Sequence, residues 1–379
     1  MDLWPACIDP DYVAGIRDFA RREIIPQADD IDRRDVYPRD IMKALAKAGY
    51  NAVALPVEHG GAGLTYGHAA AVFEEVSYAS AAVGISLITI FQAQTIIRIF
   101  GNDTLKKTFL PQFGQGLLSS YAMTEANHGS DIRSLDTKAV RDGDDWVLTG
   151  EKSFITSGSA AEFFIILAET PVGVSTFAVP AGLDGLSSYI GTNSATFGLR
   201  NGPHVNLVLD KVRLPGHALI GVEGKGVRQA VGTLNYSRTL AGAISIGIAR
   251  AAFDAALAFV GKRKAFDQRV IEFQGIQWYF ADMLAEIEAA RLLVYRAAEA
   301  LDSGVDQDRY ASAAKLKAAK VATDVAALAV QVCGAYGVME NAPFGRFLRD
   351  AKAYEIAGGS AEILKNTLGK YLTRVLAAS

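Results

Sequence analysis

The sequence predicts a three-part protein in which a β-domain lies between two helical domains. Residues 1–118 place apolar side chains at helical spacing, with charged residues between them. From residue 119 to residue 225, short β-branched or aromatic runs are separated by Gly, Pro and Asp, which is typical of strands joined by turns. From residue 226 to residue 379, long Ala- and Leu-rich segments return, and they predict packed helices.

Composition excludes several functional classes. The chain has 379 residues, of which 50% are hydrophobic and 21% are charged, as expected for a folded protein with more than one core. A net charge of −3 disfavours nucleic-acid binding. Cys7 and Cys333 are the only cysteines, so we expect neither disulfides nor a cysteine-based metal site, and a reducing cytoplasm is the expected location.

The N-terminal residues and the most apolar stretch give no reason to expect a membrane protein. The first residues lack the basic and then apolar pattern of a secretory signal. The most apolar helical stretch, residues 239–260, is interrupted by Arg250 and Asp254, whose charges would be costly at a bilayer centre. We therefore expect a helix buried among other helices.

Individual elements follow from the same patterns. Helices are expected at 12–34, 39–50, 67–82 and 84–100, and Gly49 is a plausible C-terminal cap of the second helix. Strands are expected within 145–158, 163–169, 175–180 and 204–215. A Gly-rich loop covers residues 57–67.

Two segments of the β-domain carry the first functional pattern. They are "YAMTEANHGSD" (121–131) and "LTGEKSFITSG" (148–158), and both resemble the flavin-binding segments of acyl-CoA dehydrogenases. Further segments match that family in order and spacing: "RKAFDQRVIEFQGIQ" (263–277), "QVCGAYGV" (331–338) and "RDAKAYEIAGGSAEI" (349–363). Each motif alone is weak, but their shared order is specific, and the resemblance covers essentially the whole chain.

The resemblance implies an acyl-CoA dehydrogenase-like fold with an N-terminal helical domain, a middle β-barrel or sheet domain and a C-terminal four-helix bundle. It also implies FAD bound between domains and across a subunit contact, in a homotetramer. A flavin needs hydrogen-bond donors at its pyrimidine end, apolar walls for its ring, and donors or cations at its pyrophosphate.

The family motifs also imply which residues contact FAD. Those expected beside the flavin ring are Tyr121, Met123, Thr124, Gly129 and Ser130, with Phe154, Ile155 and Thr156 on the other side. Those expected at the ADP part of a neighbouring subunit's FAD are Arg263, Phe266, Gln274, Gln331 and Gly334. Ala335 departs from the family, which often has a second glycine there. Ser360 and Glu362 are also expected to touch FAD.

The catalytic base is the main departure from the family. Dehydrogenation of a thioester removes an α-proton while a hydride leaves the β-carbon, so it needs a polarised carbonyl and a base. In most relatives the base is a glutamate of a C-terminal Y-E-G-T motif, and its place falls on Gly358. Other branches carry the glutamate directly before an arginine of the first long C-terminal helix, and that place falls on Ser237, beside Arg238. The resemblance therefore implies that both usual positions lack the acid.

Three side chains are candidates for handling the proton in its place: first His128, then Tyr236, then Glu355. An imidazole exchanges protons near neutral pH, although a loop histidine can equally face solvent. Tyr236 neighbours the second base position but could equally be a packing residue. Glu355 lies one helical turn before Gly358 if the segment is helical, and relatives carry polar residues there without a catalytic role.

Other residues are expected to bind the substrate. By match to relatives, Arg238 orients the substrate or a catalytic group, and a backbone N–H near Gly358 holds the thioester oxygen. Gln92 and Gln94 fall on a helix that lines the acyl pocket in relatives, where an amide can hydrogen-bond but cannot act as a base. Ser130 and Tyr236 complete the predicted substrate contacts. We also expect that Gly358 leaves room for a bulkier acyl group.

Three functions stay open at the level of sequence. The favoured one is an FAD-dependent oxidoreductase that dehydrogenates an acyl thioester with a non-standard proton acceptor. The second is a flavin-dependent monooxygenase or elimination catalyst, and the third is a non-catalytic flavin-binding partner subunit. The acyl carrier is CoA or an acyl carrier protein, and the electron acceptor is an electron-transfer flavoprotein or oxygen.

Overall fold

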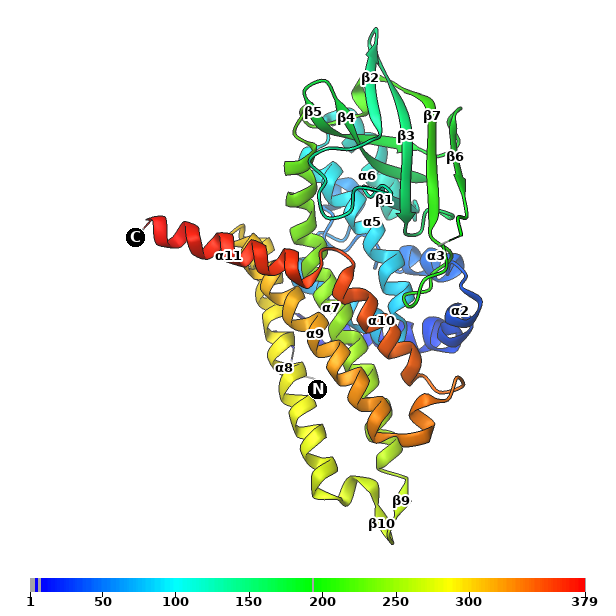
Figure 1. Cartoon of the computed structure of the whole chain (residues 1–379), viewed down its shortest axis with the longest axis vertical. Coiled ribbons are helices and arrows are strands. Elements are labelled where there is room, and N and C mark those ends of the chain that lie inside the picture. The colour runs from blue at the N-terminus through cyan, green and yellow to red at the C-terminus, as the bar shows by residue number, and fades with distance from the viewer. Residues whose placement is uncertain (1–3, 6–7, 193, 379) are drawn as a thin grey trace.

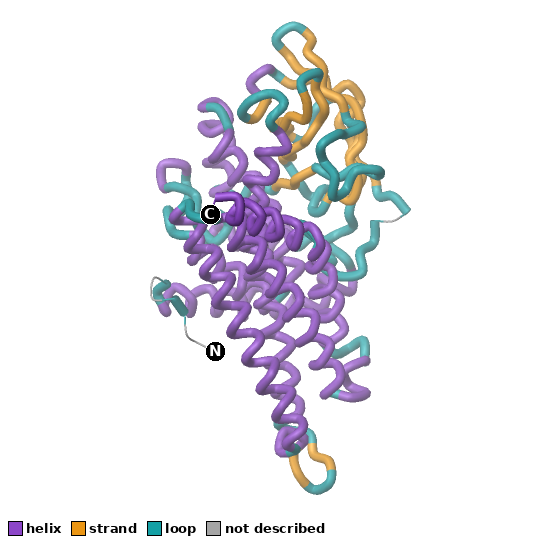
Figure 2. The backbone as a smooth tube through the Cα atoms, turned by 60° about the vertical axis from the view of Figure 1, so that its left-hand side comes forward, coloured by secondary structure: helices purple, strands orange, loops and turns teal. Residues whose placement is uncertain are grey.

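The computed structural model describes residues 4–5, 8–192 and 194–378 and has the three parts that the sequence predicts (Figure 1). The strands of the main sheet, β1 to β8, gather at one end of the molecule, and the helices of both helical parts pack side by side below them (Figure 2). The fold class is therefore confirmed. Cys333 is a buried thiol, whereas Cys7 lies outside the described residues.

All secondary structure described in the N-terminal part is helical. Its elements are α1 (Pro10–Phe19), η1 (Ala20–Ile24), η2 (Ile25–Gln27), α2 (Ala28–Arg34), α3 (Arg39–Lys47), η3 (Val57–His59), α4 (Tyr66–Ala79), α5 (Ala81–Phe100) and α6 (Asp103–Gly114). The helix expected over 12–34 is interrupted by a π turn and a 3-10 turn around Pro26, because proline has no N–H to donate to the helix ladder. Gly49, at φ 79°, follows α3 in the left-handed conformation expected of a cap.

The middle part is an eight-stranded sheet of order β6-β7-β3-β2-β4-β5-β8, with β1 paired to β4. Its elements are β1 (Ser119–Ala122), β2 (Lys138–Asp142), β3 (Asp145–Ile155), β4 (Phe163–Thr170), β5 (Gly173–Pro180), β6 (Leu186–Tyr189), β7 (Val205–Leu214), η4 (Gly216–Ala218) and β8 (Leu219–Ile220). The pairing of β3 with β7 shifts register between Lys152 and Ile155. Phe154 lies within this irregularity at φ 57°, which turns its backbone away from the regular pleat.

The C-terminal part is a helical bundle. Its elements are α7 (Gly226–Val260), β9 (Lys264–Ala265), β10 (Gln268–Arg269), η5 (Val270–Glu272), α8 (Gln274–Ser303), α9 (Gln307–Val332), η6 (Gly334–Val338), α10 (Phe344–Ile356) and α11 (Ala361–Ala378). The β9–β10 hairpin extends from the end of the bundle far from the sheet, and α11 projects sideways from it (Figure 1).

Among the described residues, two helices are long and apolar enough to cross a membrane by length and composition, namely α5 and α7. Most of the apolar window of each is buried inside the protein. Both are therefore core helices. The apolar stretch at residues 239–260 that the sequence analysis considered lies in α7, and α5 is a second helix of the same kind.

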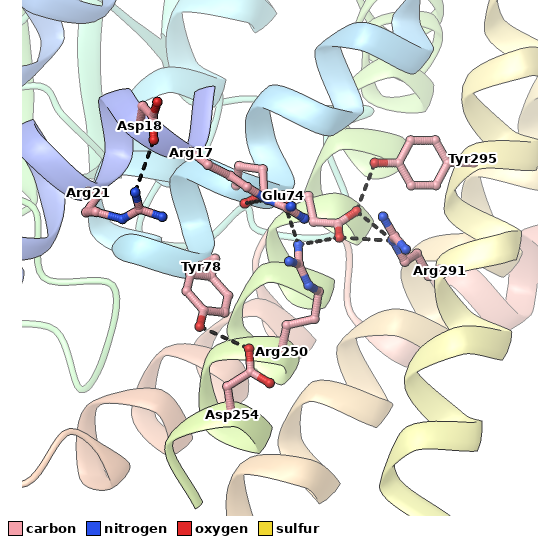
Figure 3. A network of polar contacts seen from close by, with 10 residues as sticks. Arg17, Asp18, Arg21, Glu74, Tyr78, Arg250, Asp254, Arg291 and Tyr295 are labelled. Atoms are coloured by element: carbon pink, nitrogen blue, oxygen red, sulfur yellow. Dashed lines mark hydrogen bonds and ion pairs between the residues drawn. The ribbon is translucent and has the colours of Figure 1, made fainter. Parts of the chain in front are cut away.

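A buried ionic network fastens the N-terminal helices to the bundle (Figure 3). The Glu74 carboxylate on α4 accepts from Arg250 Nη1 on α7 at 2.6 Å and from Tyr295 Oη on α8 at 2.8 Å. Arg291 Nε lies 3.0 Å from the same carboxylate. Removing one partner of such a buried group would leave uncompensated charge, so the network holds α4, and with it α5, in a fixed position against α7.

Candidate functional site

A cavity of about 160 Å³ lies where the three parts of the protein meet. The described residues that line it are Ile85, Ile88, Thr89 and Gln92 from α5; Tyr121, Met123 and Thr124 from β1 and the loop after it; Phe154, Ile155 and Thr156 at the end of β3; Leu234, Ser237 and Ala241 from α7; and Tyr354, Ala357 and Gly358 at the end of α10. None of these is Asp, Glu or His. The room expected beside Gly358 for a bulkier acyl group stays a prediction.

The β-domain wall of the cavity brings the two flavin-type segments together. Ser153 N–H donates to Thr124 O at 2.9 Å, which ties the first segment to the second. Phe154 is 52% exposed, and this places an uncovered aromatic surface on the wall. The Tyr121 hydroxyl is buried without a partner among the described residues, and burial raises its pKa above the ordinary range. The wall thus offers apolar surface together with an unused donor.

A buried ion pair that sequence reasoning missed stabilises this wall. Lys152 Nζ donates to Glu125 Oε1 at 2.6 Å, and the same carboxylate accepts the backbone N–H of Asp136 at 2.6 Å and of Thr137 at 3.1 Å. Burial acts to raise the pKa of Glu125, but the bonds from Lys152 and Thr137 outweigh it and lower that pKa overall. Burial lowers the pKa of Lys152 to about 8. The pair holds the 121–131 loop against β3. In the sequence it was indicated by one charged residue in each flavin-type segment, Glu125 in the first and Lys152 in the second.

His128 does not line the cavity. Its backbone pairs with Glu125 in a short bridge, and its Nε2 lies 3.5 Å from Asp136 Oδ1. Gly129 and Ser130, which follow it, are exposed and also lie outside the cavity lining. The structure therefore groups His128 with an acid of its own loop.

Tyr236 and Glu355 also point away from the cavity lining. The Tyr236 ring packs on Tyr66, with ring centroids 4.9 Å apart, and lies under the Arg98 guanidinium. Glu355 forms an ion pair with Lys352 and faces the groove between α9 and α11. The three candidate proton handlers thus lie at three separate places.

The two glutamines of α5 lie in different surroundings. Gln92 lines the cavity, whereas Gln94 is buried and donates to Asn51 O at 2.7 Å. Gln94 therefore has a structural partner.

Arg238 is 5% exposed, and its Nε has no hydrogen-bond partner among the described residues. It lies against the turn formed by Gly358 and Gly359, because a Cβ added to Gly359 would be 3.5 Å from Arg238 Nη2.

Comparison with known proteins assigns this architecture to a family. The N-terminal, middle and C-terminal domain models of acyl-CoA dehydrogenases match residues 11–116, 120–212 and 224–373. The chain belongs to the acyl-CoA dehydrogenase family. It is 37% identical over 368 residues to a probable acyl-CoA dehydrogenase of Mycobacterium leprae, an alignment that covers 95% of this chain and 94% of the relative.

Two solved structures are similar over nearly their whole length. The butyryl-CoA dehydrogenase of Megasphaera elsdenii has a TM-score of 0.94 at 31% identity, with 98% of this chain and 100% of that chain covered. The prolyl acyl carrier protein oxidase AnaB has a TM-score of 0.92 at 25% identity, with 98% and 100% covered. Members of the acyl-CoA dehydrogenase family bind FAD and oxidise the CH–CH bond of acyl-CoA donors, so this chain is a flavoenzyme of that class.

The cavity wall fits the flavin ring of this family. The Met123–Thr124 and Phe154–Thr156 segments line the cavity, with the exposed Phe154 ring as apolar surface, and the Tyr121 hydroxyl is a buried polar group that lacks a partner among the described residues. These features suit a planar ring with a polar edge.

The residues expected at the ADP part of FAD lie in the C-terminal part of the chain, and its β9–β10 hairpin lies at the end of the molecule far from the sheet. Arg263 and Phe266 are on the β9–β10 hairpin, and Gln274 begins α8 nearby. Phe266 is 91% exposed at φ 51° and packs only edge-on against Phe273, with centroids 6.3 Å apart. Gln331 and Gly334 are exposed beside η6, and Ser360 and Glu362 lie at the start of α11. Figure 1 places the β9–β10 hairpin far from the sheet, so Arg263 and Phe266 do not share one cavity with the flavin wall of the same chain.

Proposed function

We propose that this flavoenzyme dehydrogenates an acyl thioester and lacks the glutamate base at both positions where its family carries one. The observation that carries the proposal is the cavity lining. Gly358 and Ser237, the two matched base positions, both face the cavity, and no described residue around it is an acid or an imidazole.

The chain's own residues would bind and orient the thioester. The Gly358 backbone is at φ 71° and lines the cavity, so its N–H is a candidate donor to the thioester oxygen. The side-chain amide of Gln92 on the opposite wall can hydrogen-bond a polar acyl group. FAD supplies a hydride acceptor when it is bound. With no acid in the cavity, the α-proton passes to water, and this favours substrates whose α-proton is acidified by a neighbouring carbonyl or double bond.

The remaining partners are proposals of the same kind. The carrier is CoA or the phosphopantetheine arm of a carrier protein, and the electron acceptor is an electron-transfer flavoprotein or oxygen. The exposed Phe266 hairpin supports an assembly in which one subunit covers the FAD of another, as in a homotetramer. A cytoplasmic location fits such soluble partners.

The test is an anaerobic titration of the FAD-loaded protein with short acyl-CoAs and with the corresponding carrier-protein thioesters. Loss of the flavin's visible absorbance upon addition of one α,β-saturated thioester with an acidified α-proton is the expected result. A flavin that stays oxidised with every thioester, yet is reduced by dithionite, would contradict dehydrogenation and favour the monooxygenase or elimination chemistry. Failure to take up FAD at all would contradict the flavoenzyme assignment itself.

A further inference from the structure

A buried lysine holds the turn that carries Gly358. Lys315 on α9 is 1% exposed, and its Nζ donates to Glu355 O at 3.1 Å and to Gly359 O at 2.7 Å. The first carbonyl belongs to the last turn of α10, and the second lies one residue beyond Gly358. Lys315 therefore bridges the two sides of the turn that lines the cavity.

The turn needs such a clamp. Gly358 is at φ 71° and Gly359 at φ 110°, so two successive residues adopt conformations that only glycine takes freely. Glycine also loses the most conformational freedom upon ordering, and the last carbonyls of a helix lack partners within it. The two bonds from Lys315 satisfy one helix-end carbonyl and fix the turn at the same time.

The same turn lies between two buried cations. Arg238 reaches Gly359 from the α7 side, and Lys315 reaches it from α9. Among the described residues, no carboxylate lies within 4.0 Å of either charged group. Burial, followed by the charge of Arg238, lowers the pKa of Lys315 to about 8, and burial also lowers the pKa of Arg238. Glu355, Glu362 and Asp308 offset these effects only from a longer range.

We propose that Lys315 is a positioning residue for the dehydrogenation: it fixes the Gly358 turn and, with Arg238, gives that turn a positive potential that stabilises the enolate of the bound thioester. This inference rests on the proposed function. Two buried positive charges without a nearby carboxylate favour any negative charge that develops beside them. Enolate formation places negative charge on the thioester oxygen, which the Gly358 N–H would hold.

The experiment measures enolate formation directly, without turnover. Acetoacetyl-CoA bound to the FAD-loaded protein ionises to its enolate and releases one proton to the buffer, with no change in oxidation state. The pH midpoint of the enolate absorbance is compared between the wild-type protein and Lys315→Met. We expect the substitution to raise the midpoint by about one pH unit, which is a tenfold weaker ionisation.

Matched variants separate the charge from the fold. Lys317→Met changes an exposed lysine two residues further along α9 that is paired with Glu286, and it should leave the midpoint unchanged. Lys315→Gln keeps a donor for one carbonyl but removes the charge, so it should shift the midpoint as Met does, even if Lys315→Met fails to fold. Lys315→Arg keeps the charge and should recover most of the wild-type midpoint.

The outcomes are distinct. A midpoint that stays at the wild-type value in both neutral variants, while FAD content is retained, overturns the inference and leaves the proposed function standing. A change confined to melting temperature also overturns it, because a purely structural lysine would do no more. If the wild-type protein neither lowers the midpoint below that of free acetoacetyl-CoA nor loses flavin absorbance with any thioester, the proposed function and the inference both fail.

Discussion

Replacing Gly358 by glutamate would return a carboxylate to the cavity. An added Cβ at Gly358 meets no atom within 4 Å, so the side chain enters open space. The cost is conformational, because φ is 71° and a left-handed backbone costs a non-glycine residue about 1–2 kcal/mol. That is a minor part of the roughly 5–15 kcal/mol by which folded proteins are stable, so Gly358→Glu should fold and melt a few degrees lower.

The gain follows from general base catalysis. A positioned base typically accelerates proton transfer by about 100- to 10,000-fold, which corresponds to about 3–5 kcal/mol of barrier. Arg238 and Lys315 beside the turn would favour the ionised form of the new carboxyl, so it should act as a base at neutral pH. The rate should rise with pH through the pKa of this carboxyl and then level off.

The assay is the anaerobic rate of flavin bleaching by butyryl-CoA in a stopped-flow spectrometer. Gly358→Gln is the matched control, because it carries the same backbone strain and nearly the same volume without a base. Gly358→Ala isolates the strain alone. Equal bleaching rates in the Glu and Gln variants, or a wild-type rate as fast as that of Glu, would refute the assignment of Gly358 to the base position.

Further substitutions test the framework around the site. Glu74→Gln should cost about 3–5 kcal/mol of unfolding free energy in urea, because it removes a buried counter-charge shared by Arg250 and Arg291 and leaves Arg250 with Glu75 alone. The exposed Glu299→Gln should cost under about 1 kcal/mol, and equal costs would contradict the network's role. Burial raises the pKa of Asp350 to about 6, so the folded protein holds a proton that the unfolded chain loses near pH 4. The protonated Asp350 carboxyl therefore contributes about 3 kcal/mol to the free energy of unfolding at low pH, and this contribution is lost as pH rises through about 4 to 6. Melting curves of Asp350→Asn should not show this loss. Phe266→Ser should lower FAD content, measured by absorbance, without lowering the urea midpoint of the apoprotein; unchanged FAD content would argue against a cross-subunit role.

The domain layout could be predicted because burial follows short-range patterns. The apolar run "FFIILAE" became β4, whose residues are nearly all buried because the strand lies within the sheet. The Gly-, Pro- and Asp-rich interruptions lie between strands, because turns also follow from short-range sequence patterns. The break in the first helix could also have been predicted from Pro26, because a residue without an N–H interrupts the hydrogen-bond ladder of a helix.

The orientation of single side chains could not be predicted, because it depends on one helical step. Tyr236 and Ser237 are neighbours on α7, yet Ser237 faces the cavity and Tyr236 packs on Tyr66. Gln92 and Gln94 on α5 diverge similarly. Adjacent positions on a helix point about 100° apart, so nearness in sequence to a catalytic position does not place a side chain in the site.

Glu355 shows a different limit. Its spacing from Gly358 suggested one helical turn, but α10 ends at Ile356 and the chain then passes through left-handed glycines. Helical spacing no longer applies across that boundary. The sequence did contain a signal for Lys315, which falls at the spacing of the buried Ala311, Ala318 and Ala322. A lysine on the apolar side of a helix needs polar partners, and only the structure shows that they are the carbonyls of the Gly358 turn.

The buried cations also bear on whether this chain is a catalyst or a flavin-binding scaffold. A scaffold gains nothing from charges held out of water, because a buried charge without a close counter-charge lowers stability by several kcal/mol. Arg238 and Lys315 nonetheless flank a turn where a carboxylate would neutralise them, and glycine leaves their positive potential available to the substrate. A site that lacks a base and retains this potential suits a thioester that is already acidic at its α-carbon. The glycine and the cations are therefore explained together by enolate stabilisation, and loss of activity alone would explain only the glycine.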